Sequence, residues 1–353
     1  MNRQRLTAFR KAALGLIACG SLLILAESAS AESDNAVTDP VVRGLTNCGL
    51  GKTADSLHVL FVLDESGSLR KHDPKNMRVE GTEKALEALK RLADRFEGKF
   101  DIDVAIHGFS GGQATTDMPY RDENPWLTFD DFDDLINDAK GFASRNVGLY
   151  TDYREAIGGA IDAFDKHDPG QTGCKTLIWF TDGVYDSENN TALTPSEIAE
   201  ITGDLCEANG LVDQLRQRAI TTIAIGLSNE STENPPDLSL VKAIASGDAV
   251  NPENPDLVLP DGKCGTQPGT GDLYQEEDPD ELIGTFEGIL ADALFESGEV
   301  SPPPLPCTPN GNLCTFDFFL GPWVDQFTAY FKLPPASSLT ASLDPPGADT
   351  APV

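Results

Sequence analysis

Apolar residues along this chain follow two alternating periodicities. Short apolar runs rich in β-branched and aromatic residues predict strands, and the segments between them, with apolar residues at helical spacing, predict helices. The strands are expected at 57–63, 103–109, 175–181, 220–226 and 272–275, and the helices at 76–97, 151–166, 195–218, 237–246 and 278–296. This alternation predicts an α/β fold with a doubly wound, mainly parallel sheet and helices on both faces.

Two of the predicted helices begin with recognisable start signals. Thr194-Pro195-Ser196-Glu197 has the pattern of a capping box, with proline at the first helical position. Asp278-Pro279-Asp280-Glu281 opens the last predicted helix in a similar way. Both signals support the helix boundaries that the periodicity predicts.

The first strand ends in a group of oxygen-bearing side chains. Leu57–Leu63 runs directly into Asp64-x-Ser66-x-Ser68, which places one carboxylate and two hydroxyls on a single turn. Open α/β sheets bind their ligands at the carboxyl ends of their strands, and ligand sets made only of oxygen suit Mg²⁺, Ca²⁺ or Mn²⁺ better than zinc or copper. Because Asp, Ser and Gly are also ordinary turn residues, this pattern alone is a weak signal.

Two later segments add the same chemistry at the ends of other elements. The strand at Cys174–Thr181 is followed by Asp182 and Gly183, and Thr151 stands at the start of a helix with apolar residues at helical spacing. These segments contribute one further carboxylate and one further hydroxyl. Three separate motifs, each at the end of a predicted element, indicate one shared site.

On these motifs, the segment 55–297 resembles a von Willebrand factor type A domain of the secreted bacterial type, with a complete metal-ion-dependent adhesion site. The resemblance assigns Asp64, Ser66 and Ser68 to the first loop of that site, Thr151 to its second loop and Asp182 to its third. It implies a bound Mg²⁺, with Mn²⁺ or Ca²⁺ as alternatives. It also implies a protein partner whose Asp or Glu carboxylate completes the metal's shell, and therefore adhesion rather than enzymatic activity.

The residue types support this chemistry by themselves. If the three hydroxyls bind the cation directly, and both carboxylates stand behind waters or accept hydrogen bonds from the hydroxyls, the first shell carries little negative charge. A divalent cation in such a shell stays electrophilic, and Mg²⁺ keeps several waters in an octahedral arrangement. A carboxylate from outside can therefore complete the shell.

The N-terminal residues have the pattern of an export signal. Four basic residues lie within the first eleven positions, an apolar stretch follows at 12–26, and Ala29-Ser30-Ala31 precedes Glu32. The mature protein is therefore expected to be secreted, extracellular or in the cell envelope. Attachment of a lipid at Cys19 is the alternative. No apolar run of about 20 residues follows the signal, so no transmembrane segment is expected.

Removal of that signal leaves six cysteines, an even number that suggests up to three disulfides in an exported protein. The six are Cys48, Cys174, Cys206, Cys264, Cys307 and Cys314. Six cysteines allow 15 pairings, and the sequence favours only Cys307 with Cys314, which enclose a turn-rich loop. No pair has the Cys-x-x-Cys spacing of a structural zinc site.

The charge of the chain restricts its partners. Lys and Arg number 26 and Asp and Glu 57, a formal charge of −31; without residues 1–31 these counts become 22 and 56, a charge of −34. This excess excludes nucleic acid as a default partner and disfavours anionic membranes. It also repels an acidic protein at long range, although a bound cation dominates within the screening length of about 8 Å.

Composition changes divide the chain into five parts. The expected order is a signal peptide at 1–31, an N-terminal linker at 32–54, the main domain at 55–297, a Pro-rich linker at 298–306 and a small, incomplete β segment at 307–353. About 50 residues bury little core of their own, so the last part needs a disulfide or a neighbour to fold.

Two other functions are alternatives to adhesion. A structural or sensory subunit of an envelope complex could use the same site for docking. Gly108-Phe109-Ser110-Gly111-Gly112 matches the nucleophile elbow of serine hydrolases, but polar loop residues follow Ser110 and only His167 lies later in the chain. A serine or metal-assisted hydrolase is therefore the least favoured function.

The four histidines show no spacing typical of a metalloprotease. His58 and His107 fall in predicted strands and are interpreted as satisfied core or edge residues. Trp126, Trp179 and Trp323 are interpreted as packing residues.

Overall fold

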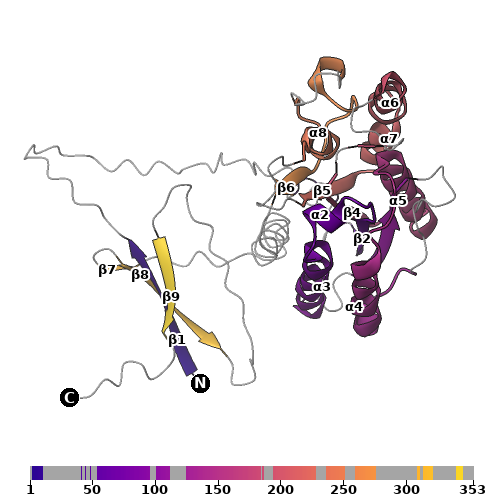
Figure 1. Cartoon of the computed structure of the whole chain (residues 1–353). Helices are drawn as coiled ribbons and strands as arrows, with labels where there is room; N and C mark the ends of the chain where they lie inside the picture. Colours follow the sequence, from indigo (N-terminus) through magenta and orange to yellow (C-terminus); the bar gives the residue numbers. More distant parts are fainter. Residues whose placement is uncertain are drawn as a thin grey trace, which may run out of the picture. The chain divides into compact units, whose positions relative to one another are not determined.

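The structure, a computed structural model of the whole chain, forms two compact units (Figure 1). One unit contains residues 35–300, and the other contains 1–34 together with 301–353. The residues described are 2–10, 41, 44, 48, 54–95, 101–111, 125–183, 185–186, 194–227, 236–250, 259–275, 308–310, 313–320 and 339–344.

The larger unit alternates strands with helices. Its strands are β2 (Ser56–Asp64), β3 (Asp101–Phe109), β4 (Cys174–Thr181), β5 (Ile220–Gly226) and β6 (Asp272–Gln275). Its α-helices are α2 (Leu69–His72), α3 (Met77–Arg95), α4 (Phe132–Gly141), α5 (Tyr153–His167), α6 (Pro195–Glu200), α7 (Leu211–Gln217) and α8 (Ser239–Ser246). Short turns of other helix types are η1 (Phe129–Asp131), η2 (Phe142–Ser144), η3 (Ile201–Cys206) and η4 (Pro260–Gly262).

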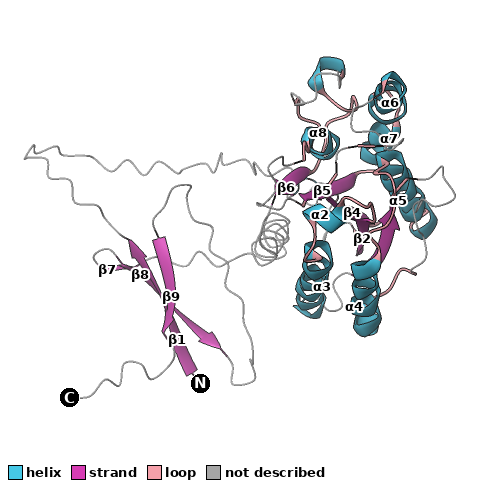
Figure 2. Cartoon of the chain, viewed as in Figure 1, coloured by secondary structure: helices cyan, strands magenta, loops and turns pink. Residues whose placement is uncertain are grey.

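The five strands form one sheet in the order β3-β2-β4-β5-β6, and every pair in it is parallel. Figure 2 shows this sheet in the middle of the unit with helices around it. The predicted doubly wound α/β fold is confirmed. All five predicted strands are present, with ends that differ from the predicted ones by at most two residues.

Strand β2 lies inside the sheet and is covered on both faces. Val59, Phe61 and Leu63 pack into one core cluster with α3 and α4, whereas Leu60 and Val62 pack into a second with α5, α7 and α8. Alternate side chains of a strand point to opposite faces, so a strand buried on both faces needs an unbroken apolar sequence. The polar residues that end this strand are therefore fixed by a rigid core.

The predicted helix at 195–218 is wrong as a single element. The structure confirms the capping box at its start, where Glu197 N donates to Thr194 Oγ1 and Thr194 N donates to the Glu197 carboxylate. The helix then passes through η3 and stops, and α7 begins after Gly210. Glu207, directly after η3, is already extended, and Asn209 then adopts a left-handed conformation with φ of 67°, which Asn tolerates better than most residues. The prediction also lacked α4.

Two disulfides join distant parts of the larger unit. Cys48 is bonded to Cys174 at the start of β4, and Cys206 at the end of η3 is bonded to Cys264. In the chain-entropy model, closing a loop of 100 residues stabilises a fold by about 4.7 kcal/mol. The first bond, together with the fully buried Val41, attaches part of the stretch expected to be a linker to the domain. Cys307, the favoured partner of Cys314, lies outside the described residues.

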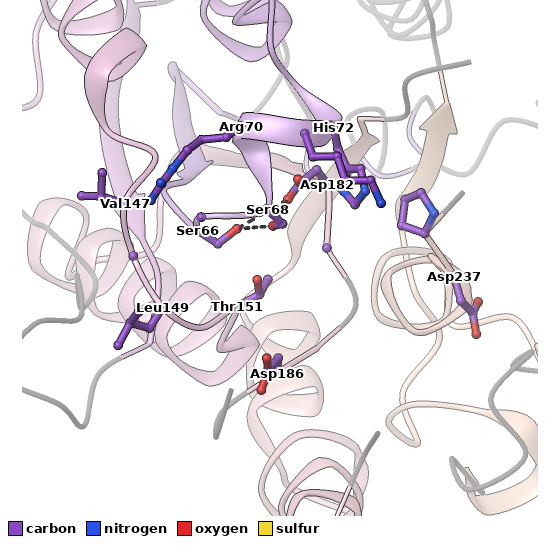
Figure 3. Close-up of a pocket in the computed structure, with 15 residues that line it drawn as sticks. Ser66, Ser68, Arg70, His72, Val147, Leu149, Thr151, Asp182, Asp186 and Asp237 are labelled. Atoms are coloured by element: carbon purple, nitrogen blue, oxygen red, sulfur yellow. Dashed lines mark hydrogen bonds and ion pairs between the residues drawn. The ribbon is translucent and has the colours of Figure 1, made fainter. Parts of the chain in front are cut away.

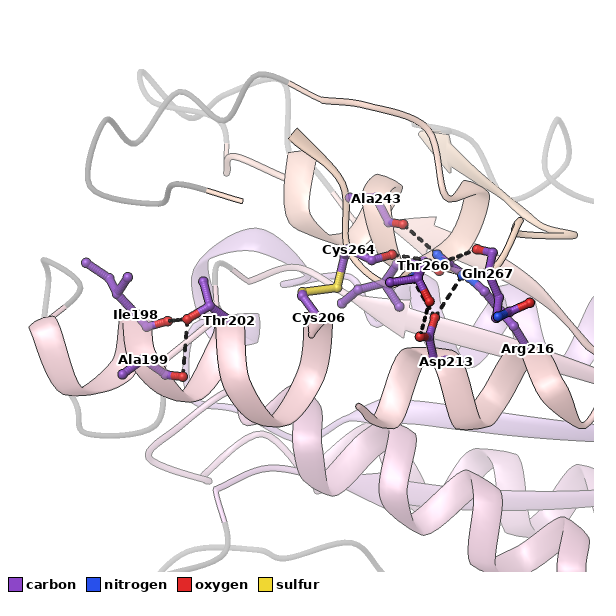
Figure 4. The surroundings of a disulfide bond; sticks show 11 residues. Ile198, Ala199, Thr202, Cys206, Asp213, Arg216, Ala243, Cys264, Thr266 and Gln267 are labelled. Atoms are coloured by element: carbon purple, nitrogen blue, oxygen red, sulfur yellow. Dashed lines mark hydrogen bonds between the residues drawn. A yellow bond between two sulfur atoms is a disulfide. The ribbon is translucent and has the colours of Figure 1, made fainter. Parts of the chain in front are cut away.

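Polar contacts from α7 hold the segment around the second disulfide (Figure 4). The Arg216 guanidinium donates to four carbonyl oxygens, two of which belong to Cys264 and Gln267. The carboxylate of Asp213 accepts from the backbone and hydroxyl of Thr266 and from Gln267 N. Burial lowers the pKa of Arg216 to about 10, so the guanidinium keeps its charge at neutral pH.

The smaller unit is a four-stranded antiparallel sheet in the order β7-β8-β1-β9. Its strands are β1 (Asn2–Arg10), β7 (Thr308–Asn310), β8 (Leu313–Leu320) and β9 (Leu339–Asp344). Strand β1 falls within the expected signal peptide and lies between β8 and β9, so cleavage before Glu32 would remove it from the sheet. The cleavage stays a prediction.

Among the helices that the structure describes, none is both long and apolar enough to cross a membrane.

Candidate metal centre

Backbone hydrogen bonds bring the three predicted metal loops together at the carboxyl edge of the sheet. Gly67 N donates to Gly148 O at 2.7 Å, and Gly148 N donates to Glu65 O at 3.0 Å, which joins the turn after β2 to the segment before α5. Thr151 N donates to Asp186 O at 2.8 Å, and Asp186 N donates back to Thr151 O at 3.1 Å. The loop after β4 is thus joined to the same segment.

Asp64, at the end of β2, is fully buried behind the hydroxyls that follow it. Its Oδ1 accepts from Ser66 N at 2.7 Å, and its Oδ2 accepts from Thr181 Oγ1 at 2.8 Å. The first bond folds the Asp64-x-Ser66 turn, and the second joins β2 to β4. The carboxylate therefore organises the turn from beneath.

Ser66, Ser68 and Asp182 share one hydrogen-bond network. The two serine hydroxyls are 2.8 Å apart, and Ser68 Oγ donates to Asp182 Oδ1 at 3.0 Å. Ser66 Oγ lies 3.5 Å from the same carboxylate oxygen. Two oxygens from β2's turn and one from the end of β4 are therefore within reach of a single small cation.

Thr151 lines the same cavity from the start of α5. Asp152 caps this helix, because its carboxylate accepts from Arg154 N at 2.9 Å, and Arg154 also forms an ion pair with it at 2.7 Å. A Cβ placed on Gly183 would lie 3.0 Å from Thr151 Oγ1, so the loop after Asp182 passes directly beside this hydroxyl. Figure 3 shows Thr151 below Ser66 and Ser68 in the close-up.

The carboxylate of Asp182 lacks part of its expected hydrogen bonding. Its Oδ2 is buried and accepts no hydrogen bond from the residues described, although His72 Nδ1 lies 3.2 Å away. A buried carboxylate oxygen without a donor is costly unless a cation neutralises it. The oxygen-only donor set and this oxygen together fit a divalent ion of the Mg²⁺ type.

The raised pKa of the Asp64 carboxyl also favours a bound cation. Burial, and secondarily the charge of Asp182, raise its pKa from 3.8 to about 7, against the lowering effect of hydrogen bonds from Ser66 and Thr181. Two buried carboxylates this close repel each other in their ionised forms. A cation between them would remove that repulsion.

The cavity over these oxygens has a volume of about 600 Å³ and a mixed rim. Arg70 and His72 of α2 lie on one side of it, and Val147 and Leu149 lie on another (Figure 3). Lys71 also lines the cavity. Among the residues described, Val147 and Leu149 are the exposed large hydrophobic side chains, with 50% and 45% of their surface exposed. No sequence motif predicts this rim, because its residues come from two separate segments and form one surface only in the folded protein.

Ser110, the nucleophile of the competing hydrolase hypothesis, is fully buried. Its Oγ donates to Tyr150 O at 2.5 Å. A Cβ placed on Gly148 would lie 2.1 Å from Ser110 Oγ, so the segment before Thr151 packs directly on this hydroxyl. The contacts of Ser110 are those of a packing residue that supports the second metal loop.

A family model described as the von Willebrand factor type A domain matches residues 58–256, more than half of the chain. A comparison with curated proteins finds no match.

Several solved structures are similar to the chain. One is the pilus adhesin SpaC from Lactobacillus rhamnosus GG, with 12% identity and a TM-score of 0.45 over 69% of this chain and 31% of that one. Another is proximal thread matrix protein 1 from the mussel byssus, with 16% identity and a TM-score of 0.34 over 69% of this chain and 46% of that one. The mussel protein with a zinc-occupied MIDAS motif has 14% identity and a TM-score of 0.37, over 68% and 48% of the two chains. The chain thus spans less than half of each of these structures.

Proposed function

This chain belongs to the von Willebrand factor type A domain family, and from that premise we propose that it is an exported protein-binding module that captures an acidic residue of a partner through a divalent cation. The cation is Mg²⁺, with Mn²⁺ or Ca²⁺ as alternatives. Its ligands, direct or through water, are Asp64, Ser66, Ser68, Thr151 and Asp182. The partner supplies an Asp or Glu carboxylate.

The observation that carries this proposal is the pairing of two buried carboxylates with three hydroxyls at one open cavity. Ser66, Ser68 and Thr151 offer neutral oxygens toward the cavity, whereas Asp64 holds the turn from behind. When bound, a divalent cation would supply an electrophilic position that an outside carboxylate can occupy. The protein side chains would hold the cation and orient the partner's carboxylate, and none of them needs to react.

The rim of the cavity offers further contacts to such a partner. Arg70 and Lys71 bring positive charge to the cavity, although the chain as a whole is strongly acidic. Local charge and the cation act on a carboxylate at short range, where the net charge of the chain is screened. Val147 and Leu149 provide apolar surface for a side chain beside that carboxylate. The preferred partner site therefore combines an acidic residue with an apolar neighbour.

Mg²⁺ or Mn²⁺ is expected to raise the melting temperature of the protein. A ligand bound only by the native state stabilises it by RT ln(1 + [L]/Kd), about 2.7 kcal/mol at a concentration of 100 Kd. The measurement is thermal unfolding of the wild type and of Asp64→Ala in excess Mg²⁺, in excess Mn²⁺ and in EDTA. The variant should show no metal-dependent shift. Identical melting of the wild type under all three conditions would show that the site binds no metal.

The metal-induced stabilisation should depend on pH. Because the folded pKa of Asp64 is about 7 and its unfolded value 3.8, the metal-free native state holds the extra proton between these values, and its stability falls as pH rises through this window. A cation competes with that proton, so the metal-induced shift in melting temperature should grow as pH rises toward and past about 7.

Asp64→Asn isolates this effect, because the amide keeps the shape of the side chain and cannot titrate. The difference in the free energy of unfolding between the metal-free wild type and this variant should change with pH only between 3.8 and about 7, the unfolded and folded pKa values of Asp64. A metal-induced shift of equal size at about pH 5.5 and about pH 8 would contradict the assigned role of the carboxylate.

A further inference from the structure

A second group of metal-ligand side chains lies at the opposite edge of the sheet. His58 and Asp103 are register partners near the starts of the parallel strands β2 and β3, and His167 is the last residue of α5. His58 precedes Asp64 by six residues of strand, a distance of about 20 Å. This His58–Asp103–His167 cluster is therefore separate from the candidate metal centre.

The spacing within the cluster is close to that of a metal's ligands. Asp103 Oδ2 lies 3.2 Å from His58 Nδ1 and 3.1 Å from His167 Nε2, and the three ligand atoms lie within 4.8 Å of one another. Ligands at about 2.0–2.1 Å from a tetrahedral Zn²⁺ are roughly 3.4 Å apart. Two of the three separations are slightly shorter than this length, and the His167–Asp103 contact is a hydrogen bond that a bound ion would replace.

His58 supplies an independent sign of a missing ligand. Its side chain is only 7% exposed, and its Nδ1 makes no hydrogen bond with the described residues, although Asp103 Oδ2 lies 3.2 Å away as an ion-pair partner. A buried ring nitrogen without a hydrogen bond is costly. A cation between the imidazole and the carboxylate would use this nitrogen's lone pair.

The other ring nitrogen of His58 already has the contacts of a metal ligand. Ligating histidines usually donate their second ring N–H to an oxygen that fixes the ring. His58 Nε2 lies 3.1 Å from Ser56 Oγ and 3.9 Å from Asp168 Oδ2, and Lys175 pairs with the same Asp168 oxygen at 3.2 Å. Any Cβ at Gly173 would collide with the His58 ring, so the backbone also closes against it.

His167 is held by an aromatic neighbour. The ring of Trp126 stacks on its imidazole with centroids 4.2 Å apart and planes 9° from parallel, while His58 meets the same imidazole edge-on at 4.7 Å. The rotation of the His167 ring is thereby restricted. His167 and Asp103 are each 23% exposed, which leaves a path for an ion and for a water ligand.

We propose that His58, Asp103 and His167 bind a transition-metal ion of the Zn²⁺ class, with water completing a tetrahedral shell. Two imidazoles and one carboxylate are ligands that suit Zn²⁺ or Co²⁺ and not Mg²⁺. The ion would join the starts of β2 and β3 to the end of α5, the helix whose first turn follows Thr151. It would therefore stabilise the fold from the edge away from the partner.

Titration with Co²⁺ tests this proposal, because tetrahedral Co²⁺ with nitrogen ligands absorbs visible light far more strongly than octahedral Co²⁺ with oxygen ligands. The full chain with Asp64→Ala, which disables the other centre, should bind one equivalent with the intense spectrum. Excess Mg²⁺ should leave the spectrum unchanged, and Zn²⁺ should abolish it by displacement. Adding His167→Gln or Asp103→Asn should weaken Co²⁺ binding by at least about a hundredfold.

His72→Gln in the Asp64→Ala background is the matched control, since His72 is a partly buried histidine beside Asp182. It should keep the intense spectrum. Absence of that spectrum from the Asp64→Ala protein would overturn the proposal, as would a spectrum that persists in both His167→Gln and Asp103→Asn. Thermal unfolding in EDTA identifies a variant that fails to fold. If one of the two does, the spectrum of the other variant tests the proposal. The result is independent of whether the first centre binds Mg²⁺.

Discussion

Thr151→Ala is expected to abolish metal-dependent capture of an acidic partner while the protein stays folded. Alanine keeps the two backbone hydrogen bonds that join Thr151 to Asp186 and removes the methyl group together with the hydroxyl that lines the cavity. Thr151 is only 4% exposed, so loss of these two groups should cost about 1 kcal/mol, which is small against a folding stability of about 5–15 kcal/mol. Loss of a residue that only holds a metal ligand in place weakens metal affinity by about 10- to 100-fold. Loss of Thr151, a proposed direct ligand, should therefore weaken capture of the partner at least about a hundredfold.

Peptides that carry one Glu or Asp beside an apolar residue, and matched peptides with Gln or Asn, provide the probe. The wild type in Mg²⁺ should prefer the acidic peptides and lose this preference in EDTA. Ser110→Ala is the control, because Ser110 packs under the second metal loop and should affect neither peptide binding nor hydrolysis. Equal binding by wild type and Thr151→Ala would contradict the proposed role. Esterase activity that disappears with Ser110→Ala would favour the hydrolase instead.

The sheet and its polar edge could be predicted because both depend on local sequence. A short apolar run such as Val59–Leu63, followed by turn residues, is typical of a strand buried on both faces, and parallel strands bring their carboxyl ends to one edge. The structure accordingly brings Asp64 and Asp182 to the same edge, where Asp182 accepts a hydrogen bond from Ser68 and Asp64 accepts one from Thr181. Whether these residues hold a metal stays a proposal that the melting experiments test.

Features that depend on contacts distant in sequence could not be predicted. Neither observed disulfide follows from spacing, because Cys48 and Cys174 are 126 residues apart and meet only through the fold. The break between η3 and α7 depends on a left-handed residue inside a continuous amphipathic pattern. His58 was interpreted as a core or edge residue, and the sequence gives no link to His167, because 109 positions separate the two.

The acidic run at 130–134 shows how composition can hide structure. Its composition alone indicates only a soluble, charged surface, yet it contains the start of α4, whose buried Leu135 and Ala139 belong to the core cluster on one face of the sheet. Acidic residues in the first turn of a helix interact favourably with its dipole, so a charged run can also mark a helix start.

Arg78 links the two chain segments that carry the metal loops, and it does so without any exposed surface. One guanidinium nitrogen pairs with Asp73 Oδ2 at 2.6 Å, just after α2. The other donates to Phe142 O at 2.9 Å and to Arg145 O at 3.2 Å, a few residues before Thr151. The carboxylate of Asp73 also accepts from Met77 N at the start of α3. A single buried side chain thus holds three segments together.

Arg78→Met is therefore expected to lower the free energy of unfolding by about 3–5 kcal/mol, the usual cost of breaking a buried ion pair and leaving one charge unpaired. Urea unfolding in EDTA measures this loss directly, without a contribution from the metal. Lys84→Ala on the same helix is the matched control: its ion pair with Glu80 is partly exposed to water and should contribute about 1 kcal/mol or less. If both variants unfold at nearly the same urea concentration, Arg78 does not hold these segments. If Arg78→Met is strongly destabilised, its surviving folded fraction should also bind Mg²⁺ more weakly, because Phe142 and Arg145 lose the anchor that positions the approach to Thr151.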